Sequence, residues 1–285
     1  MSGFVHSLKA VYIIWYREVL RYWRDKLRII GSLARPFFFL VVFGGGLSHS
    51  MSGTMRMLPG GVMAPSLDFV KFLFPGIIGM TILFTSVMSG VSIIWDREFG
   101  FLKEILVAPI GRTAVALGKT LGGSTVAMIQ GSIMLLFAPF IGIELSLGLL
   151  LRLWPLMFIT SIALTSLGVL IAARMHSMEG FHMIVNFLLM PMFFLSGAFF
   201  PLRDLPSWMD ILVKLNPLTY AIDALRQSIF RTMELPEMVL KLLPQAGLSL
   251  SVMGHNMTIM DDVAVILAFA TVMLGVAVWA FSIRE

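Results

Sequence analysis

The chain has 285 residues, of which 58% are hydrophobic and only 13% are charged, and its mean hydropathy is +0.91. Soluble domains hold about 25% charged residues, so this composition excludes an ordinary water-soluble protein and leaves no room for a separate soluble catalytic domain. The sequence contains no cysteine, which excludes disulfides, thiolate catalysis and cysteine-ligated metal sites. The formal net charge of +5 is expected to face membrane lipids and not nucleic acid, because the basic residues stand beside apolar runs.

Residues 5–28 carry an amphipathic pattern. Apolar and aromatic residues recur at helical spacing, and arginines occupy the opposite face. The apolar positions are Leu8, Val11, Tyr12, Trp15, Val19 and Tyr22, and the basic ones are Arg17, Arg21, Arg24 and Arg28. This pattern predicts a basic amphipathic helix that lies in the membrane interface. A plain basic anchor that only sets topology is the alternative.

Six apolar segments follow along the chain. A helix that crosses about 30 Å of hydrocarbon needs about 20 apolar residues, and each of these segments meets that length. They are residues 29–48, 73–95, 114–141, 153–173, 181–200 and 262–283. The sequence therefore predicts an all-α membrane protein with six transmembrane helices in a single domain, residues 1–285, and an even number of crossings places both termini on one side.

Lysine and arginine residues indicate the orientation, since cytoplasmic loops carry an excess of them. Most of them stand in the segment before the first span and in the link between spans two and three. They are Lys9, Arg17, Arg21, Arg24, Lys26, Arg28 and Arg35, and then Arg97, Lys103, Arg112 and Lys119. We therefore expect a multi-pass protein of a bacterial or archaeal cytoplasmic membrane with its N and C termini in the cytoplasm.

The link between spans two and three contains a second amphipathic pattern over residues 96–108. Acidic residues come first, apolar residues follow on one side, and Pro109 stops the helix. The apolar residues are Phe101, Leu102, Ile105 and Leu106. This pattern favours a surface helix that docks a cytoplasmic protein, and a solvated loop helix without a partner is the alternative.

The segment between spans five and six is too long for a simple connector. Pro206 precedes a helical pattern that ends at Leu215, and Asn216-Pro217 then caps a second pattern that continues to Arg231. We predict two external helices over residues 203–231 that enter the outer leaflet as a re-entrant pair. Their backbone ends would need burial in protein or contact with water.

Motifs for chemistry within the chain are weak. Gly118-Lys119-Thr120 lacks the glycine that a phosphate-binding loop needs five positions before Gly118, where Thr113 stands. The histidines show no metal-binding spacing. The acid pairs Asp96 with Glu98 and Asp261 with Asp262 are interpreted as caps at helix starts. The span centres hold almost no ionisable residues, and their polar exceptions are interpreted as interhelical hydrogen bonds. These exceptions are Gln130, His182 and Asn186.

Three stretches together resemble a known family. They are DREFGFLKEILVAP at 96–109, LSGAFFP at 195–201 and LNPLTYAIDALR at 215–226. In this order, inside a six-span layout, the chain resembles the membrane permease subunits of the ABC type-2 transporter family over essentially its full length.

The resemblance implies an ATP-driven exporter in which this chain is a non-catalytic subunit. It would pair with a second permease copy, most simply as a homodimer, and two ATP-binding cassette subunits would dock from the cytoplasm. ATP and magnesium would then be bound by those partner chains, and no cofactor by this chain. Residues 5–28 would be the connecting helix and residues 96–108 the coupling helix. The exported substrate would be amphipathic, such as a drug, a lipid or a lipid-linked glycan.

The resemblance also assigns residues to three regions. For partner docking the coupling helix offers Arg97, Glu98, Phe101, Leu102, Lys103 and Glu104, and the external helices near the exit contain Asn216, Pro217, Tyr220, Asp223 and Arg226. A translocation path between two copies would be lined by Thr81, Phe84, Thr85, Met88, Asn186, Phe187, Met190 and Phe194. Ordinary helix packing is the competing explanation for the path residues.

Two other function classes are weighed against this one. A stand-alone secondary transporter or channel would need a carboxylate or an ion cage at the membrane midplane, and the span centres offer neither. An intramembrane enzyme or assembly scaffold would need clustered catalytic or metal-ligating side chains at one depth, and none cluster in the sequence.

Overall fold

A computed structural model describes residues 2–58, 62–63, 68–99, 111–203, 205–233, 239, 242–252 and 254–282. The described chain is almost entirely helical. Its α-helices are α1 (Ser2–Arg24), α2 (Lys26–Arg56), α3 (Phe69–Met88), α4 (Val91–Glu98), α6 (Arg112–Leu135), α7 (Leu147–Arg174), α8 (Met178–Phe194), α9 (Ser207–Leu215), α10 (Pro217–Phe230) and α12 (Ile259–Ser282). A short 3-10 helix, η2 (Ala138–Ile141), follows α6. Two small antiparallel hairpins pair β1 (Met57–Leu58) with β2 (Val62–Met63) and β3 (Ser251–Val252) with β4 (His255–Asn256).

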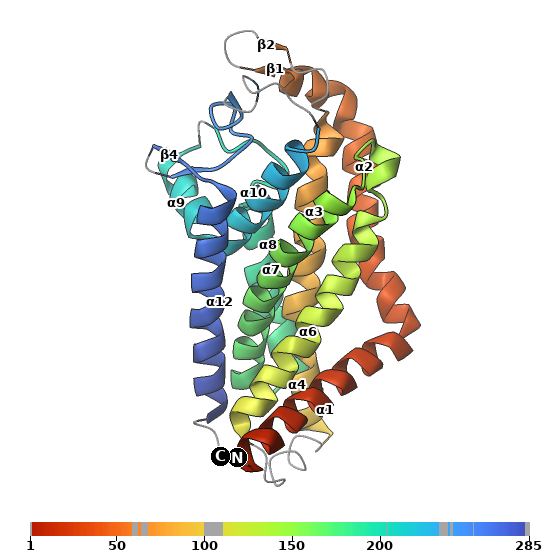
Figure 1. Ribbon diagram of the computed structural model, residues 1–285, viewed down its shortest axis with the longest axis vertical. Helices are drawn as coiled ribbons and strands as arrows, with labels where there is room; N and C mark the ends of the chain where they lie inside the picture. Colours follow the sequence, from red (N-terminus) through yellow and green to blue (C-terminus); the bar gives the residue numbers. More distant parts are fainter. Residues whose placement is uncertain are drawn as a thin grey trace.

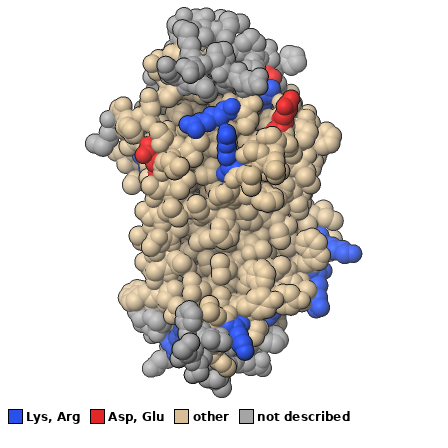
Figure 2. All heavy atoms as spheres, viewed as in Figure 1, with Lys and Arg blue, Asp and Glu red and all other residues tan. Residues whose placement is uncertain are grey.

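The long helices form one elongated bundle (Figure 1). The helix α1 crosses one end of this bundle obliquely, and the start of α1 and the end of α12 both lie at that end, which we call the terminal end. The helices α9 and α10 lie toward the opposite end, beside the start of α12. Figure 2 shows a band of uncharged surface across the middle of the visible face, with Lys and Arg side chains toward both ends. This distribution is typical of a bundle that crosses a membrane.

Each of the six predicted spans overlaps helical structure of the bundle, but the predicted spans 114–141 and 181–200 extend past the ends of α6 and α8. Within the described residues, four stretches are long and apolar enough to cross a membrane: Ile29–Gly46, Phe69–Glu98, Leu147–Arg174 and Ile259–Phe281. The helix α8 has only 17 residues, and α6 does not reach the same combination of length and hydropathy. The chain is therefore an all-α, multi-pass membrane protein, and the count of six crossings stays a prediction.

The second predicted span bends where α3 ends and α4 begins, at Ser89-Gly90. A Cβ atom on Gly90 would lie 2.6 Å from the carbonyl oxygen of Gly168 in α7, and one on Gly168 would lie 2.5 Å from the carbonyl oxygen of Val87. Only glycine at both positions lets the two backbones approach this closely. The bend is therefore held against α7, and the centre of α3 is buried on all sides from Phe72 to Leu83.

A second close contact joins α1 to α6. A Cβ atom on Gly118 would lie 2.8 Å from the Cβ of Ile14, and one on Gly122 would lie 2.6 Å from the Cβ of Glu18. Glycines four residues apart share one face of a helix and allow another helix to pack closely there. Gly118, the glycine of the weak phosphate-loop motif Gly118-Lys119-Thr120, therefore serves helix packing.

The structure confirms that residues 5–28 are mostly helical but changes the interpretation of the two faces. Leu8 and Tyr12 are exposed, as expected for a surface helix, whereas Tyr22 is buried. The Trp15 indole nitrogen donates a hydrogen bond of 2.9 Å to Thr125 of α6. Part of the predicted apolar stripe, with Trp15 and Tyr22, therefore packs against the bundle, and part, with Leu8 and Tyr12, stays exposed. The reason is that α1 needs one face to pack against α6.

The two predicted external helices are present as α9 and α10. Asn216 caps α10, since its side chain accepts a hydrogen bond of 3.1 Å from the Leu218 amide, and Pro217 occupies the first turn, where its missing N–H has no helical partner to lose. The same Asn216 side chain donates a hydrogen bond of 2.6 Å to the Met192 carbonyl near the end of α8. These two hydrogen bonds of Asn216 fix the break between α9 and α10. Their re-entrant position in a membrane stays a prediction.

Candidate functional site

A cavity of about 200 Å³ lies between α2, α3 and α6, beside the last turn of α1. Gly31 and Arg35 on its α2 side are exposed, so the cavity opens at the surface of the bundle. Its lining residues are Tyr22, Gly31, Ser32, Arg35, Pro36, Met80, Thr81, Phe84, Thr85, Met88, Val126 and Gln130. Their mixture of apolar, hydroxyl and amide side chains suits an amphipathic molecule.

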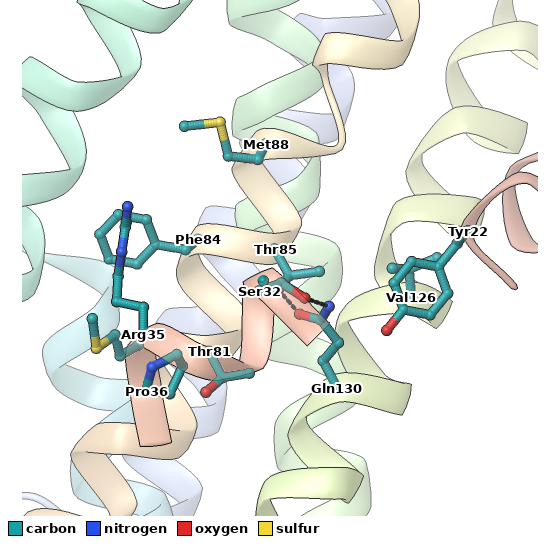
Figure 3. A pocket seen from close by; sticks show the side chains of 12 residues that line it. Tyr22, Ser32, Arg35, Pro36, Thr81, Phe84, Thr85, Met88, Val126 and Gln130 are labelled. Carbon is teal, nitrogen blue, oxygen red and sulfur yellow. Dashed lines mark hydrogen bonds between the residues drawn. The ribbon is translucent and has the colours of Figure 1, made fainter. Parts of the chain in front are cut away.

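One side of the cavity is held by a hydrogen-bond bridge across three helices (Figure 3). Gln130 of α6 accepts a hydrogen bond from the Thr85 hydroxyl of α3, and its amide nitrogen donates to the Ser32 hydroxyl of α2. The Ser32 hydroxyl in turn donates a hydrogen bond of 2.9 Å to the Ile29 carbonyl. The predicted interhelical hydrogen bonds of Gln130 are therefore confirmed, and they fix the spacing of the helices that surround the cavity.

Arg35 borders the other side of the cavity. Its guanidinium carbon lies 4.8 Å from the centre of the Phe84 ring, a cation–π contact between α2 and α3, and Figure 3 shows its side chain extending past that ring. Arg35 lies inside the candidate span Ile29–Gly46. In the sequence Arg35 resembles the flanking basic residues, because it stands near the start of an apolar run, but in the structure it lies within the candidate span.

The structure divides the predicted path residues into two groups. Thr81, Phe84, Thr85 and Met88 all line the cavity. Asn186, Phe187, Met190 and Phe194 lie instead on the exposed face of α8, where Phe187 is 83% exposed. The two groups adjoin one another, because the Phe84 ring lies 6.3 Å from the ring of Phe193 on the buried face of α8. The exposed face of α8 also carries Met183 and has no charged residue between Phe181 and Phe194.

A group of charges around the buried residues Glu18, Asp96 and Lys119 joins α1, α4 and α6 at the terminal end of the bundle, and we call it the ion-pair cluster. Its members are Arg17, Glu18, Arg21, Asp96 and Lys119. The Lys119 ammonium lies 2.6 Å from Glu18 and 2.5 Å from Asp96, and it donates 3.1 Å to Ser92. Asp96 also pairs with Arg17, and its other oxygen lies 3.5 Å from Arg21.

This ion-pair cluster was not foreseen from the sequence. The interpretation of Asp96 as a helix-start cap is wrong, because Asp96 lies in the second half of α4 and is 1% exposed. Lys119 is 3% exposed and not a solvated flanking charge. Buried charges need opposite partners, so the one available signal was Lys119 inside an otherwise apolar helix. Its partners are 101 and 23 residues away in sequence, which local patterns cannot reveal.

The predicted coupling segment continues directly from this cluster. Arg97 turns into the protein, where it donates hydrogen bonds to the carbonyls of Met175 and Ala173 and so caps the end of α7. Glu98 is exposed. Phe101, Leu102, Lys103 and Glu104 lie outside the described residues, so their assignment to partner docking stays a prediction.

The predicted residues of the external helices converge on a buried polar group at the opposite end. The Arg226 guanidinium donates a hydrogen bond of 2.6 Å to the Gly197 carbonyl and lies 4.0 Å from the centre of the Phe72 ring. The Asp223 carboxylate accepts a hydrogen bond of 2.8 Å from the Gln227 amide and one of 3.3 Å from the Ser249 hydroxyl. Burial raises the pKa of Asp223 above its ordinary value, against the opposing effect of Arg226.

Two further residues of this end join neighbouring helices. The Tyr220 hydroxyl donates 2.7 Å to the Lys214 carbonyl of α9, and Gln227 lies 3.4 Å from the Asp262 carboxylate of α12. Asp262 is fully buried, so the interpretation as a helix cap fits Asp261 alone. The Asp261 carboxylate accepts a hydrogen bond of 2.9 Å from the Thr258 amide at the start of α12. Among the described residues, no three acidic or histidine side chains gather to hold a metal ion.

Comparison with known proteins places the chain in a family. The profile of the ABC-2 type transporters matches residues 9–230. The chain is 28% identical to the putative transport permease ycf38 of Cyanophora paradoxa over 221 residues, 77% of this chain and 73% of the relative. It is 27% identical to nodulation protein J of Rhizobium leguminosarum bv. viciae over 222 residues, 76% of this chain and 80% of that protein.

A shorter match connects the chain to a bacterial relative. It is 29% identical to the probable multidrug ABC transporter permease YbhR of Escherichia coli K12 over 170 residues, 57% of this chain and 45% of that protein. The matched family consists of permeases that pair with ATP-binding subunits. The cavity, the uncharged face of α8 and the buried ion-pair cluster thus belong to a transport permease subunit, and the chain is a member of the ABC-2 type transporter family.

Proposed function

We propose that this chain forms the translocation path of an ATP-driven exporter as a homodimer. Two separate ATP-binding subunits dock at its terminal end, bind ATP and magnesium, and carry the ATPase activity. The observation that carries the proposal is the position of a cavity with polar groups beside an exposed helix face without charges. Such a face is expected to meet a second copy or lipid, and the cavity beside it would then open toward the interface between the two copies.

The orientation follows from the same proposal. The terminal end, with α1 and the ion-pair cluster, lies in the cytoplasm, and α9 and α10 lie outside a bacterial or archaeal cytoplasmic membrane. Support comes from the basic residues of α1 and from the segment at 96–108, which would act as the coupling helix. In this arrangement the ion-pair cluster makes α1, α4 and α6 move as one unit, because breaking it would leave charges buried without partners.

The coupling mechanism is a change between two packings of rigid helices. Closure of the ATP-binding subunits would move residues 96–108, and α4 would transmit this movement through Asp96 to Lys119 of α6 and to Arg17 of α1. The helices around the cavity are continuous with this unit, because α3 leads into α4 and Gln130 lies on α6. Opening and closing of the cavity would thus follow ATP binding and hydrolysis.

The substrate class is an amphipathic molecule, such as a drug, a lipid or a lipid-linked glycan. One of the similar proteins is named a probable multidrug transporter, which agrees with this class. A stand-alone secondary transporter is the second candidate, and the charge of Arg35 in a span is the observation in its favour. The cavity lining contains no carboxylate, which disfavours coupling to protons or cations.

Cysteine cross-linking tests the dimer directly, because the chain has no cysteine of its own. Phe187→Cys on α8 is compared with Val272→Cys on α12, two positions that are 83% and 56% exposed. We expect an oxidant to give a covalent dimer in membranes from Phe187→Cys alone. Equal cross-linking at both positions, or none at Phe187→Cys, would contradict the proposed interface.

The ATP requirement is tested with the chain purified together with its ATP-binding subunit and reconstituted into proteoliposomes. We expect substrate movement only with ATP and magnesium, and none when the ATP-binding subunit is omitted. Phe101→Asp combined with Leu102→Asp should abolish co-purification of that subunit. Transport by this chain alone, or full co-purification of the double variant, would disprove the proposal.

A further inference from the structure

Arg35 combines a charge with a position inside a candidate span. Taking 1.5 Å per helical residue, it lies roughly 9 Å along α2 from Ile29, where the candidate span begins. Its contact partner Phe84 stands at the middle of the 30-residue stretch Phe69–Glu98. A guanidinium at this depth is unfavourable unless an anion or water accompanies it, and such charges usually mark a functional site.

Nothing in the described part of the chain supplies an anion for Arg35. No carboxylate there lies within ion-pair distance of its guanidinium, and the contact that the structure gives it is the Phe84 ring. The acidic residues Glu18 and Asp96 are already committed to the ion-pair cluster at the terminal end. A guanidinium carries five N–H donors, and its contact with the ring leaves them available.

The hydroxyl groups of Ser32, Thr81 and Thr85 and the amide of Gln130 in the cavity lining already have partners. Ser32, Thr85 and Gln130 are bonded to one another, and the Thr81 hydroxyl donates 2.8 Å to the Ile77 carbonyl. Arg35 is thus the group in the cavity lining with an unmatched charge. Its guanidinium lies against the Phe84 ring, and Figure 3 shows the side chain extending past that ring at the border of the cavity.

We propose that Arg35 binds the anionic headgroup of an amphiphile in this cavity, with a phosphate or a carboxylate as its counter-ion. The apolar part of the ligand would lie along Met80, Met88 and Val126 of the lining and continue toward the uncharged face of α8. This inference rests on the proposed function and narrows its substrate class to anionic amphiphiles. The same chemistry has two sources, a transported substrate or a resident membrane lipid.

Native mass spectrometry of the full-length chain, released from a neutral detergent, tests the site without ATP. The probes are oleoyl lysophosphatidic acid and neutral monooleoylglycerol, which share an acyl chain and differ in the phosphate. We expect the wild-type chain to bind the phosphate probe about tenfold more tightly than the neutral one, as a charge-assisted contact predicts. Arg35→Gln should remove this preference, and Arg35→Lys should keep most of it.

Two further variants keep the test independent of folding. Lys26→Gln removes an exposed basic residue at the start of α2, outside the cavity, and should leave the preference unchanged. Phe84→Leu keeps the charge but removes the ring, and it should weaken binding of the phosphate probe less than Arg35→Gln does. Equal phosphate preference in Arg35→Gln and in the wild-type chain overturns the proposal, and so does an equal loss in Lys26→Gln.

Reconstitution with the ATP-binding subunit distinguishes the two sources. If the anion is a substrate, a fluorescent lysophosphatidic acid moves across proteoliposomes with ATP, and Arg35→Gln slows this movement about tenfold. If the anion is a resident lipid, Arg35→Gln loses the bound phosphate probe while movement of the fluorescent probe stays absent in the wild type. Failure of the proposed function appears differently: the ATP-binding subunit does not co-purify with the wild-type chain, whereas the preference for the phosphate probe in the spectra is kept.

Discussion

Lys119 and Glu18 form an ion pair, with 2.6 Å between the ammonium nitrogen and a carboxylate oxygen, and this pair joins α6 to α1. Both side chains are buried, at 2% and 9% exposure. The same ammonium reaches Asp96 of α4. One lysine therefore connects the N-terminal helix, the helix that leads into the proposed coupling segment and a helix of the bundle.

Replacing Lys119 by methionine should destabilise the protein by about 3 kcal/mol, because Glu18 and Asp96 would keep buried charges with fewer partners. Thermal unfolding of the purified chain in detergent measures this. The double variant Glu18→Gln with Lys119→Met should recover part of the loss, since it also removes one of the stranded charges. An unchanged unfolding midpoint in Lys119→Met would show that the cluster contributes no stability, and Lys26→Gln serves as the exposed control.

Gly122→Ala should loosen α1 from α6. The added Cβ would lie 2.6 Å from the Cβ of Glu18, so one helix must shift, at a cost typical of overpacking, about 1–3 kcal/mol. The matched control is Gly275→Ala on α12, where no atom lies within 4 Å of an added Cβ. Limited proteolysis at the N-terminal segment is the measurement. Equal cleavage of the two variants would contradict the close packing.

Gln130→Leu should affect transport more than stability. Leucine has a similar size but leaves Thr85 and Ser32 without their shared partner, a loss of about 1 kcal/mol for each interhelical hydrogen bond in a membrane protein. The helices around the cavity would lose their bridge, so ATP-driven transport should fall several-fold while the unfolding midpoint falls by only a few degrees, on the order of 5 °C. Thr271→Val, which removes only a bond of 2.8 Å to Leu267 on α12, should leave both measurements unchanged.

Asp223→Asn should alter the pH dependence of stability. Burial raises the pKa of Asp223 in the folded protein, so the folded state binds a proton more readily than the unfolded state, whose aspartate pKa is about 3.9. The stabilising contribution is therefore complete below about pH 4 and is lost as the pH rises through the higher folded value. Its neighbours are Arg226 and Gln227 on the same helix, Ser249 and the Leu250 amide on the following segment, and the Asp262 carboxyl of α12.

The difference in unfolding free energy between Asp223→Asn and the wild type measures this dependence. Asparagine does not titrate, so the variant should gain stability relative to the wild type as the pH rises above about 4. A difference that stays constant from pH 4 to pH 8 would contradict the raised pKa. Asp210→Asn is the control, because Asp210 is exposed and pairs with Lys214 in the same helix.

Much of the fold follows from composition and local pattern. Six apolar runs predict six long helices, since a backbone in lipid must satisfy its own hydrogen bonds within each segment. The break at Asn216-Pro217 also follows locally, because an amide cap followed by a proline at the first helical position favours a helix start there. The translocation path that the family resemblance implies contains Thr81, Phe84, Thr85 and Met88, and these four residues line one cavity.

The charged residues show the limit of such patterns. Arg35 and Lys119 each stand near a helix start and resemble the flanking lysines and arginines in sequence. Their roles depend on which side chain of another helix they meet, Phe84 for Arg35 and Glu18 with Asp96 for Lys119. The membrane environment and the helical spans are determined by the sequence, because hydropathy and hydrogen bonding act within a segment. Only the tertiary structure decides which charges are buried and which partners they have. The reason is that an ion pair between residues 101 positions apart depends on how the helices pack.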